Sequence, residues 1–222
     1  MVIDVCRLGH SGERVRVSNA ILLAFGALAL RVTWVACASV TPVSDFAGYE
    51  QHAVAWLNTG TFGVAGNLAY RTPGYPALIA ATYAVVGEHP KGVGYVQAAL
   101  GALSCLLLVL IVGRFASPRA ALTAAVLLAV SPTALAYTPV LASENLSTPV
   151  MLLGLLLVDN SRRAEGGRAL TWSAGAGVVF GLLMLVRPAA IFLAPAFVLL
   201  VFVGGGQGKD SRGWHNRPAR TG

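Results

Sequence analysis

The feature that most constrains this chain is a series of long apolar blocks without a single charged residue. These blocks cover residues 92–113, 120–143, 145–158, 169–186 and 188–208. Charged residues make up only 11% of the chain and hydrophobic residues 56%, with a mean hydropathy of +0.70. A soluble domain carries about 25% charged residues. The composition therefore excludes a soluble globular domain and a disordered chain, and it is typical of a membrane protein.

The lengths of the blocks indicate how many times the chain crosses the bilayer. A helix needs about 20 apolar residues to span the hydrocarbon core. Together with an apolar N-terminal run, the blocks predict about six transmembrane helices near 19–39, 93–113, 120–138, 142–159, 169–187 and 189–205. The sequence thus predicts an all-α fold, a polytopic membrane helix bundle. Its expected parts are an N-terminal segment at 1–18, a transmembrane module at 19–205 and a disordered basic tail at 206–222.

One further apolar segment, residues 73–87, is short and has two prolines at its start. If it does not cross the membrane and the N-terminus is cytoplasmic, twelve of the sixteen basic residues lie inside; if it crosses, nine of those twelve move outside. Cytoplasmic loops carry an excess of Lys and Arg. The charges therefore favour a multi-pass plasma-membrane protein with a cytoplasmic N-terminus. Residues 40–91 then form one long outer loop with two juxtamembrane helices, over 45–56 and 73–87.

Two acidic residues are expected at the outer face of this bundle. Asp45 follows the first span, and Glu144 lies in an otherwise apolar stretch from 120 to 158. An ionisable group at membrane depth is costly and points to function. Two carboxylates at one depth could remove a proton from a hydroxyl nucleophile. Asp45 could instead cap a helix, and Glu144 could simply reach water at the interface.

Arg71, Lys91 and Arg187 are the basic residues expected in the outer loops. A guanidinium suits a phosphate head group because it combines charge with forked hydrogen bonding. The alternative is that these side chains snorkel to lipid phosphates. Arg31 lies within the first predicted span and could either snorkel or pair inside the bundle.

Several chemistries have no support in the sequence. The three cysteines show no CxxC spacing, and the four histidines form no metal-ligand pattern. No phosphate-binding loop of the GxxxxGK[ST] or GxGxxG type is present. The basic residues lie in short hinges between apolar blocks rather than on one face, so nucleic acid is not an expected partner. A bilayer is.

Five short motifs, in order along the chain, resemble those of a known family. They are Ser44-Asp45-Phe46-Ala47-Gly48-Tyr49, Tyr70-Arg71-Thr72-Pro73-Gly74-Tyr75-Pro76, Val96-Gln97-Ala98-Ala99-Leu100-Gly101, Ser143-Glu144-Asn145-Leu146 and Arg187-Pro188. Their order and spacing are similar to those of membrane glycosyltransferases of the GT-C superfamily, bacterial family 39 type. These enzymes are relatives of protein mannosyltransferases and lipid A sugar transferases. The resemblance covers about residues 17–205.

The resemblance implies that a sugar passes from a polyprenyl-phosphate donor to a lipid, glycan or protein acceptor at the outer face. It implies that Asp45 is the general base and that transfer inverts the anomeric carbon. Glu144 would assist the site or bind the acceptor, and Arg71 and Arg187 would hold the donor phosphate. The residues implied to shape the site are Tyr49, Pro73, Gly74, Tyr75 and Pro76. No metal or cofactor is implied.

The chain also departs from the family pattern. Phe46 follows Asp45, where the eukaryotic protein mannosyltransferases have a paired Asp-Glu. Family members are much longer, so the chain resembles their N-terminal part. One alternative is therefore a non-catalytic fragment or split module that needs a missing C-terminal half or a partner subunit. A small transporter is disfavoured, because the acids are expected at the outer edge rather than at mid-depth.

Overall fold

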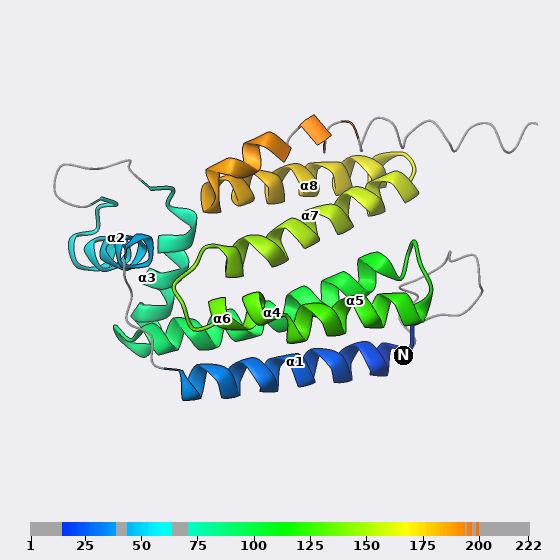
Figure 1. The fold of residues 1–222 in the computed structure, drawn as a ribbon. Helices are drawn as coiled ribbons and strands as arrows, with labels where there is room; N and C mark the ends of the chain where they lie inside the picture. Colours follow the sequence, from blue (N-terminus) through cyan, green and yellow to red (C-terminus); the bar gives the residue numbers. More distant parts are fainter. Residues whose placement is uncertain (1–14, 39–43, 64–70, 194, 197–198, 200–222) are drawn as a thin grey trace, which may run out of the picture.

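The computed structural model describes residues 15–38, 44–63, 71–193, 195, 196 and 199. Within these ranges every regular element is a helix, which confirms the all-α prediction (Figure 1). The elements are α1 (Val17–Cys37), α2 (Asp45–Thr59), α3 (Gly74–Val86), α4 (Pro90–Val112), α5 (Pro118–Val130), α6 (Pro132–Tyr137), α7 (Glu144–Arg163), α8 (Gly167–Val186) and a 3-10 helix, η1 (Pro188–Leu193). The predicted tail at 206–222 and most of the N-terminal segment lie outside the described residues.

Helix α4 lies at the centre of the bundle. It packs against α1, α5 and α7, and α7 in turn pairs with α8 (Figure 1). On α5, three alanines spaced four residues apart face this centre, Ala121, Ala125 and Ala129. Residues at this spacing share one helix face, and small side chains let neighbouring helices approach closely. The small side chains therefore let α1, α4 and α5 approach closely, and valine and leucine side chains pack around them.

Two predicted spans differ from the structure. The segment 120–138 was expected to be one helix, but it breaks at Ser131 into α5 and α6. The cause is Pro132, because the residue before a proline is pushed towards extended backbone, and Ser131 has ψ of 121°. The segment 189–205 was expected to be an α-helix, but it begins inside η1. By length and composition, α1, α4 and α8 could each cross a membrane.

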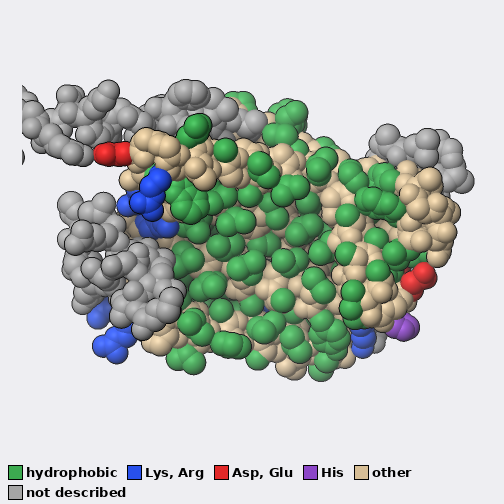
Figure 2. Space-filling model, turned by 180° about the vertical axis from the view of Figure 1, so that it is seen from behind, with side chains coloured by type: hydrophobic (Ala, Val, Ile, Leu, Met, Phe, Trp, Pro, Cys, Tyr) green, Lys and Arg blue, Asp and Glu red, His purple; other side chains and the backbone are tan. Residues whose placement is uncertain are grey.

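The charged residues gather at the two ends of the bundle. Figure 2 shows a wide belt of hydrophobic side chains with the basic and acidic side chains confined to either side of it. The start of α1, the α4–α5 turn and the α7–α8 turn share one end, which carries Arg114, Arg119, Arg162, Arg163 and Arg168 (Figure 1). The opposite end, which we call the site end, holds α2, α3 and the start of α7. This segregation of charge fits a bundle that crosses a bilayer.

Helices α2 and α3 lie at the site end, and α3 runs across the direction of the long helices (Figure 1). With 13 residues, α3 is about 20 Å long, which is too short to span a bilayer core. The last turn of α1 lies beside the first turn of α4, since Lys91 Nζ donates to the carbonyl of Ala36 at 3.2 Å. The chain between α1 and α4 therefore leaves and re-enters at the same end, and it carries both short helices as predicted.

Candidate functional site

An ion pair between Asp45 and Arg71 occupies the site end. Arg71 Nη2 donates to Asp45 Oδ1 at 2.8 Å, and the Asp45 side chain is 75% exposed whereas that of Arg71 is 14% exposed. Burial opposes the charge on Arg71, but the hydrogen bond and the charge of Asp45 raise its pKa overall. Ser44, not Asp45, occupies the N-cap of α2. Asp45 is therefore an open carboxylate oriented by a largely buried guanidinium.

Arg71 is held in place by α2. Its Cζ lies 4.7 Å from the centre of the Tyr49 ring, a distance at which a cation is attracted to an aromatic face. Tyr49 follows Asp45 by four residues, so both side chains lie on one face of α2. Gly48 makes room for the guanidinium, because a Cβ there would lie 2.8 Å from Arg71 Nε. The motif Asp45-Phe46-Ala47-Gly48-Tyr49 thus forms the binding surface for the Arg71 guanidinium, through Asp45, Gly48 and Tyr49.

We expect Gly48→Ala to lower transfer activity by about tenfold while changing the unfolding midpoint little. The added methyl group displaces Arg71, and the end of a flexible side chain can move without disturbing the core. Activity and thermal unfolding in detergent measure the two effects. Gly26→Ala on α1, where a Cβ meets nothing within 4 Å, is the matched control. An activity equal to that of the control would contradict this role of Gly48.

A second ion pair joins Glu144 to Arg187. Arg187 Nη1 donates to Glu144 Oε1 at 2.9 Å, with the two side chains 46% and 44% exposed. Glu144 is the first residue of α7, where the helix dipole favours a negative charge. Arg187 directly follows α8, and Pro188 after it stops the helix. The structure therefore pairs each predicted carboxylate with one of the two predicted phosphate ligands.

The segment Arg71–Pro76 connects the two ion pairs. Thr72 Oγ1 donates to the carbonyl of Val186 at 3.3 Å, next to Arg187. A Cβ on Gly74 would lie 2.7 Å from the carbonyl oxygen of Leu185, so the backbone of α3 meets that of α8 directly. Pro73 and Pro76 flank this contact at the start of α3, where a proline costs no helical hydrogen bond. The predicted site-shaping residues thus bring the end of α8 to the loop that carries Arg71.

Gln97 is a central residue of the site that was not among the predicted site residues. It is fully buried in α4 and accepts hydrogen bonds from Tyr75 Oη at 2.5 Å and from Asn145 Nδ2 at 3.1 Å. Its own Nε2 donates to the carbonyls of Thr138 at 2.8 Å and Val140 at 2.9 Å. Burial raises the pKa of Tyr75 well above its usual range, so its hydroxyl remains a donor. The network holds α3, α4 and the turn before Glu144 together.

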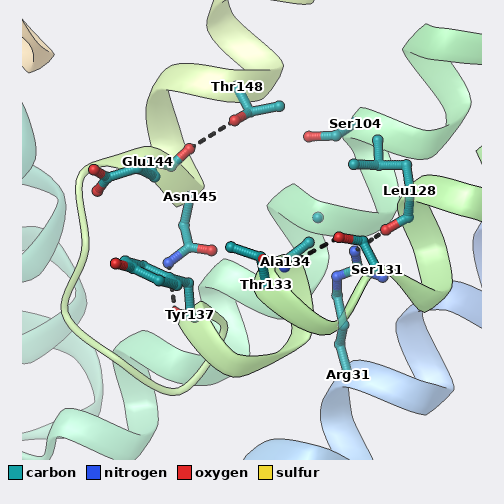
Figure 3. Close-up of a pocket in the computed structure, with 11 residues that line it drawn as sticks. Arg31, Ser104, Leu128, Ser131, Thr133, Ala134, Tyr137, Glu144, Asn145 and Thr148 are labelled. Atoms are coloured by element: carbon teal, nitrogen blue, oxygen red, sulfur yellow. Dashed lines mark hydrogen bonds between the residues drawn. The ribbon is translucent and has the colours of Figure 1, made fainter.

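A cavity of about 390 Å³ lies beside this network (Figure 3). Glu144 and Asn145 of α7 line one side, and Tyr137 of α6 lines another. Phe46, the neighbour of Asp45, packs edge-on against Tyr137, with 6.4 Å between ring centres. The cavity therefore begins next to α2. The remaining lining residues are Arg31, Gly101, Ser104, Leu128, Ser131, Thr133, Ala134 and Thr148.

Arg31 lies at the far side of the cavity and does not snorkel. It is only 2% exposed, and it donates from Nη2 to the carbonyl of Leu128 at 3.1 Å and from Nη1 to that of Ala129 at 3.2 Å. Leu128 would normally accept from residue 132, which is a proline and has no N–H. Arg31 thus bonds to carbonyls that the α5–α6 break leaves open. Within the described ranges, no three His, Cys, Asp or Glu side chains come together to hold a metal ion.

Long apolar helices with the charged residues gathered at the two ends of the bundle are typical of an integral membrane protein. The chain belongs to the family of dolichyl-phosphate-mannose-protein mannosyltransferases, whose model matches residues 70–212. This family is part of the GT-C superfamily, so the class is membrane glycosyltransferase. The matched range includes Arg71, Glu144 and Arg187, and it begins after α2 and Asp45. No curated protein and no solved structure matched the chain.

Proposed function

We propose that this chain transfers a sugar from a polyprenyl-phosphate donor to a hydroxyl group of a lipid, glycan or protein acceptor at the outer face of the plasma membrane. The observation that carries the proposal is the Asp45–Arg71 pair, which sets an exposed carboxylate beside a cation. The family membership supports the class of reaction, and the apolar belt of the bundle supports a lipid-linked donor.

In the proposed reaction Asp45 is the general base. Its exposed carboxylate takes the proton of the acceptor hydroxyl as the oxygen attacks the anomeric carbon of the sugar. The new glycosidic C–O bond forms while the C–O bond to the phosphate breaks, and the polyprenyl phosphate leaves with the bonding electrons. Attack opposite to the leaving group inverts the anomeric carbon. A positioned base of this kind contributes about 10²–10⁴-fold to the rate.

Arg71 would stabilise the leaving phosphate. Its guanidinium lies 2.8 Å from the carboxylate that activates the acceptor, so one side chain could orient the base and offset the charge that develops on the departing oxygen. Interactions that strengthen as charge develops lower the barrier. Arg187, nearly half exposed and paired with Glu144, would contact the same phosphate. Glu144 would then help to place the acceptor from the wall of the cavity.

The test is a transfer assay with the purified full chain in detergent. The assay supplies polyprenyl-phosphate sugars together with extracted membrane acceptors. We expect a glycosylated acceptor and free polyprenyl phosphate in equal amounts, because each transfer releases one lipid phosphate. Release of lipid phosphate without a glycosylated acceptor would indicate hydrolysis, and it would contradict the proposal. So would the absence of both products across all sugars offered.

The proposed topology predicts the side from which the loop between α2 and α3 reacts. In a variant with Cys6, Cys37 and Cys105 replaced, a single cysteine at Gly63 should react with a membrane-impermeant maleimide added to intact cells. A cysteine at Arg168, in the first turn of α8, should react only after the cells are opened. The reverse pattern would contradict a cytoplasmic N-terminus. Gel shifts with a maleimide-coupled polymer report both positions.

A further inference from the structure

Arg31 places a positive charge within the membrane-spanning part of the bundle. It lies six residues before the end of α1 at Cys37, which corresponds to about 9 Å along the helix. Its side chain is almost fully buried and lines the same cavity as Glu144, on the opposite side. A charged residue at this depth is costly, and such residues usually mark a ligand or ion pathway.

The described residues offer this charge only neutral partners. The guanidinium donates to the carbonyls of Ala27 at 3.5 Å, Leu128 at 3.1 Å and Ala129 at 3.2 Å. None of the Asp and Glu side chains in the described ranges forms an ion pair with it. The carbonyls at the end of a helix carry only about half a negative charge. A net positive charge therefore remains at the edge of the cavity, where a buried charge normally requires an opposite one.

The walls of the cavity suit an anion. The hydroxyl groups of Ser131 and Thr133, at the α5–α6 break, lie on the Arg31 side of the cavity (Figure 3). Those of Ser104 and Thr148 also line the cavity, but they donate to the carbonyls of Leu100 and Glu144. Hydroxyl groups can donate hydrogen bonds to anionic oxygens. The Glu144 carboxylate points away from Arg31 in Figure 3, and it is paired with Arg187. Glu144, the acidic residue on the cavity wall, therefore does not neutralise the positive charge of Arg31.

Gly101 shows that the bundle is shaped around the Arg31 side chain. A Cβ at Gly101 would lie 2.7 Å from Arg31 Cδ and would also meet Nε, so only glycine lets the Arg31 side chain take this position. The break at Pro132 leaves the carbonyls of Leu128 and Ala129 free to accept from Arg31. Gly101 and this break together fix the guanidinium at the wall of the cavity.

We propose that this cavity binds the anionic head group of a membrane lipid, of the phosphate class, with Arg31 as its charge partner. A lipid is the favoured source because the bundle carries large exposed hydrophobic side chains that face the bilayer, among them Leu22, Phe25, Leu127 and Val178. A head group from the outer leaflet needs to descend only about 9 Å to reach Arg31. The site shares the cavity with Glu144 but uses side chains other than the Asp45–Arg71 pair, so lipid binding at Arg31 can be measured without the transfer reaction.

Native mass spectrometry of the purified full chain tests this site. Phosphatidylglycerol, zwitterionic phosphatidylcholine and inorganic phosphate are titrated separately in a neutral detergent. We expect one phosphatidylglycerol bound per chain, with phosphatidylcholine held about tenfold more weakly. Arg31→Gln keeps donors for the α5 carbonyls but removes the charge, and it should weaken phosphatidylglycerol binding by about tenfold or more. Arg168→Gln, which removes an exposed charge at the opposite end, is the matched control and should bind normally.

Two further variants test the lipid site if Arg31→Gln does not fold. Thr133→Val removes a wall hydroxyl from an exposed position, and Gly101→Ala pushes against the guanidinium; both should weaken phosphatidylglycerol binding several-fold. Equal binding of the two lipids by the unmodified chain would overturn the proposal, as would unchanged binding by the folded variants. Binding of inorganic phosphate without any phosphatidylglycerol would overturn the assignment to a lipid.

Discussion

Asp45→Asn is expected to reduce the turnover number for sugar transfer by about 10²–10⁴-fold. The amide has nearly the same shape as the carboxylate but cannot accept the proton of the acceptor hydroxyl. Asp45 is 75% exposed and contacts Arg71 at 2.8 Å, so the loss should come from chemistry and not from unfolding. Because Arg71 loses its anionic partner, the KM for the phosphate-bearing donor should stay the same or fall. Steady-state kinetics with varied donor measures both constants.

Glu88→Gln is the matched control for this variant. Glu88 is an exposed acid just before α4, and its replacement removes the same charge from the site end without contacting Arg71. It should leave kcat within about twofold, since surface substitutions away from a site have small effects. If Asp45→Asn and Glu88→Gln have equal turnover, Asp45 is not the base. A large rise in donor KM with unchanged kcat would instead make Asp45 a binding residue.

Gln97→Leu is expected to destabilise the folded chain by about 2–4 kcal/mol. Leucine keeps the volume but leaves the carbonyls of Thr138 and Val140 and the hydroxyl of Tyr75 without their partner. Each buried polar group left unsatisfied costs about 1–3 kcal/mol, and hydrogen bonds in membrane proteins lie at the lower end of that range. Unfolding in mixed micelles with increasing dodecyl sulfate measures the free-energy change.

Ser104→Ala on the same helix provides the comparison. Ser104 is also buried, but its hydroxyl donates only to the carbonyl of Leu100 one turn earlier. Its removal leaves the contacts between helices intact and should cost less than about 1 kcal/mol. If the two variants unfold at the same concentration of dodecyl sulfate, Gln97 is not the centre of the network. Transfer activity should fall with Gln97→Leu, because the turn before Glu144 loses its anchor.

The architecture could be predicted because it depends on local properties. The apolar run at 19–39 predicted α1, and the uncharged blocks predicted α4 and α8, in nearly their observed positions, since a bilayer demands about 20 apolar residues wherever a helix crosses. The short apolar segment 73–87, with two prolines at its start, predicted α3. The break at Ser131 does not follow from the length of the uncharged block, and Pro132 is the only local signal for it.

The site could be predicted only in part. Asp45, Arg71, Glu144 and Arg187 stood out as charges in an apolar chain, and the structure brings all four to one end of the bundle. Their pairing could not be read from the sequence, because Asp45 and Arg71 lie 26 residues apart and Glu144 and Arg187 lie 43 apart. The pairing of the acids with the arginines depends on how α3 packs against α8. That contact requires Gly74, because a Cβ there would clash with the backbone of Leu185.

The amino-acid sequence by itself determined that this chain is a helical membrane protein with most of its charges at the helix ends, because hydrophobicity and charge act residue by residue against the bilayer. Only the tertiary structure decided what the isolated polar residues do. Arg31 meets carbonyls 97 and 98 residues away, and Gln97 joins three segments of the chain. Such contacts follow from the packing of whole helices, since the direction of a polar side chain in an apolar bundle is set by the partners that surround it.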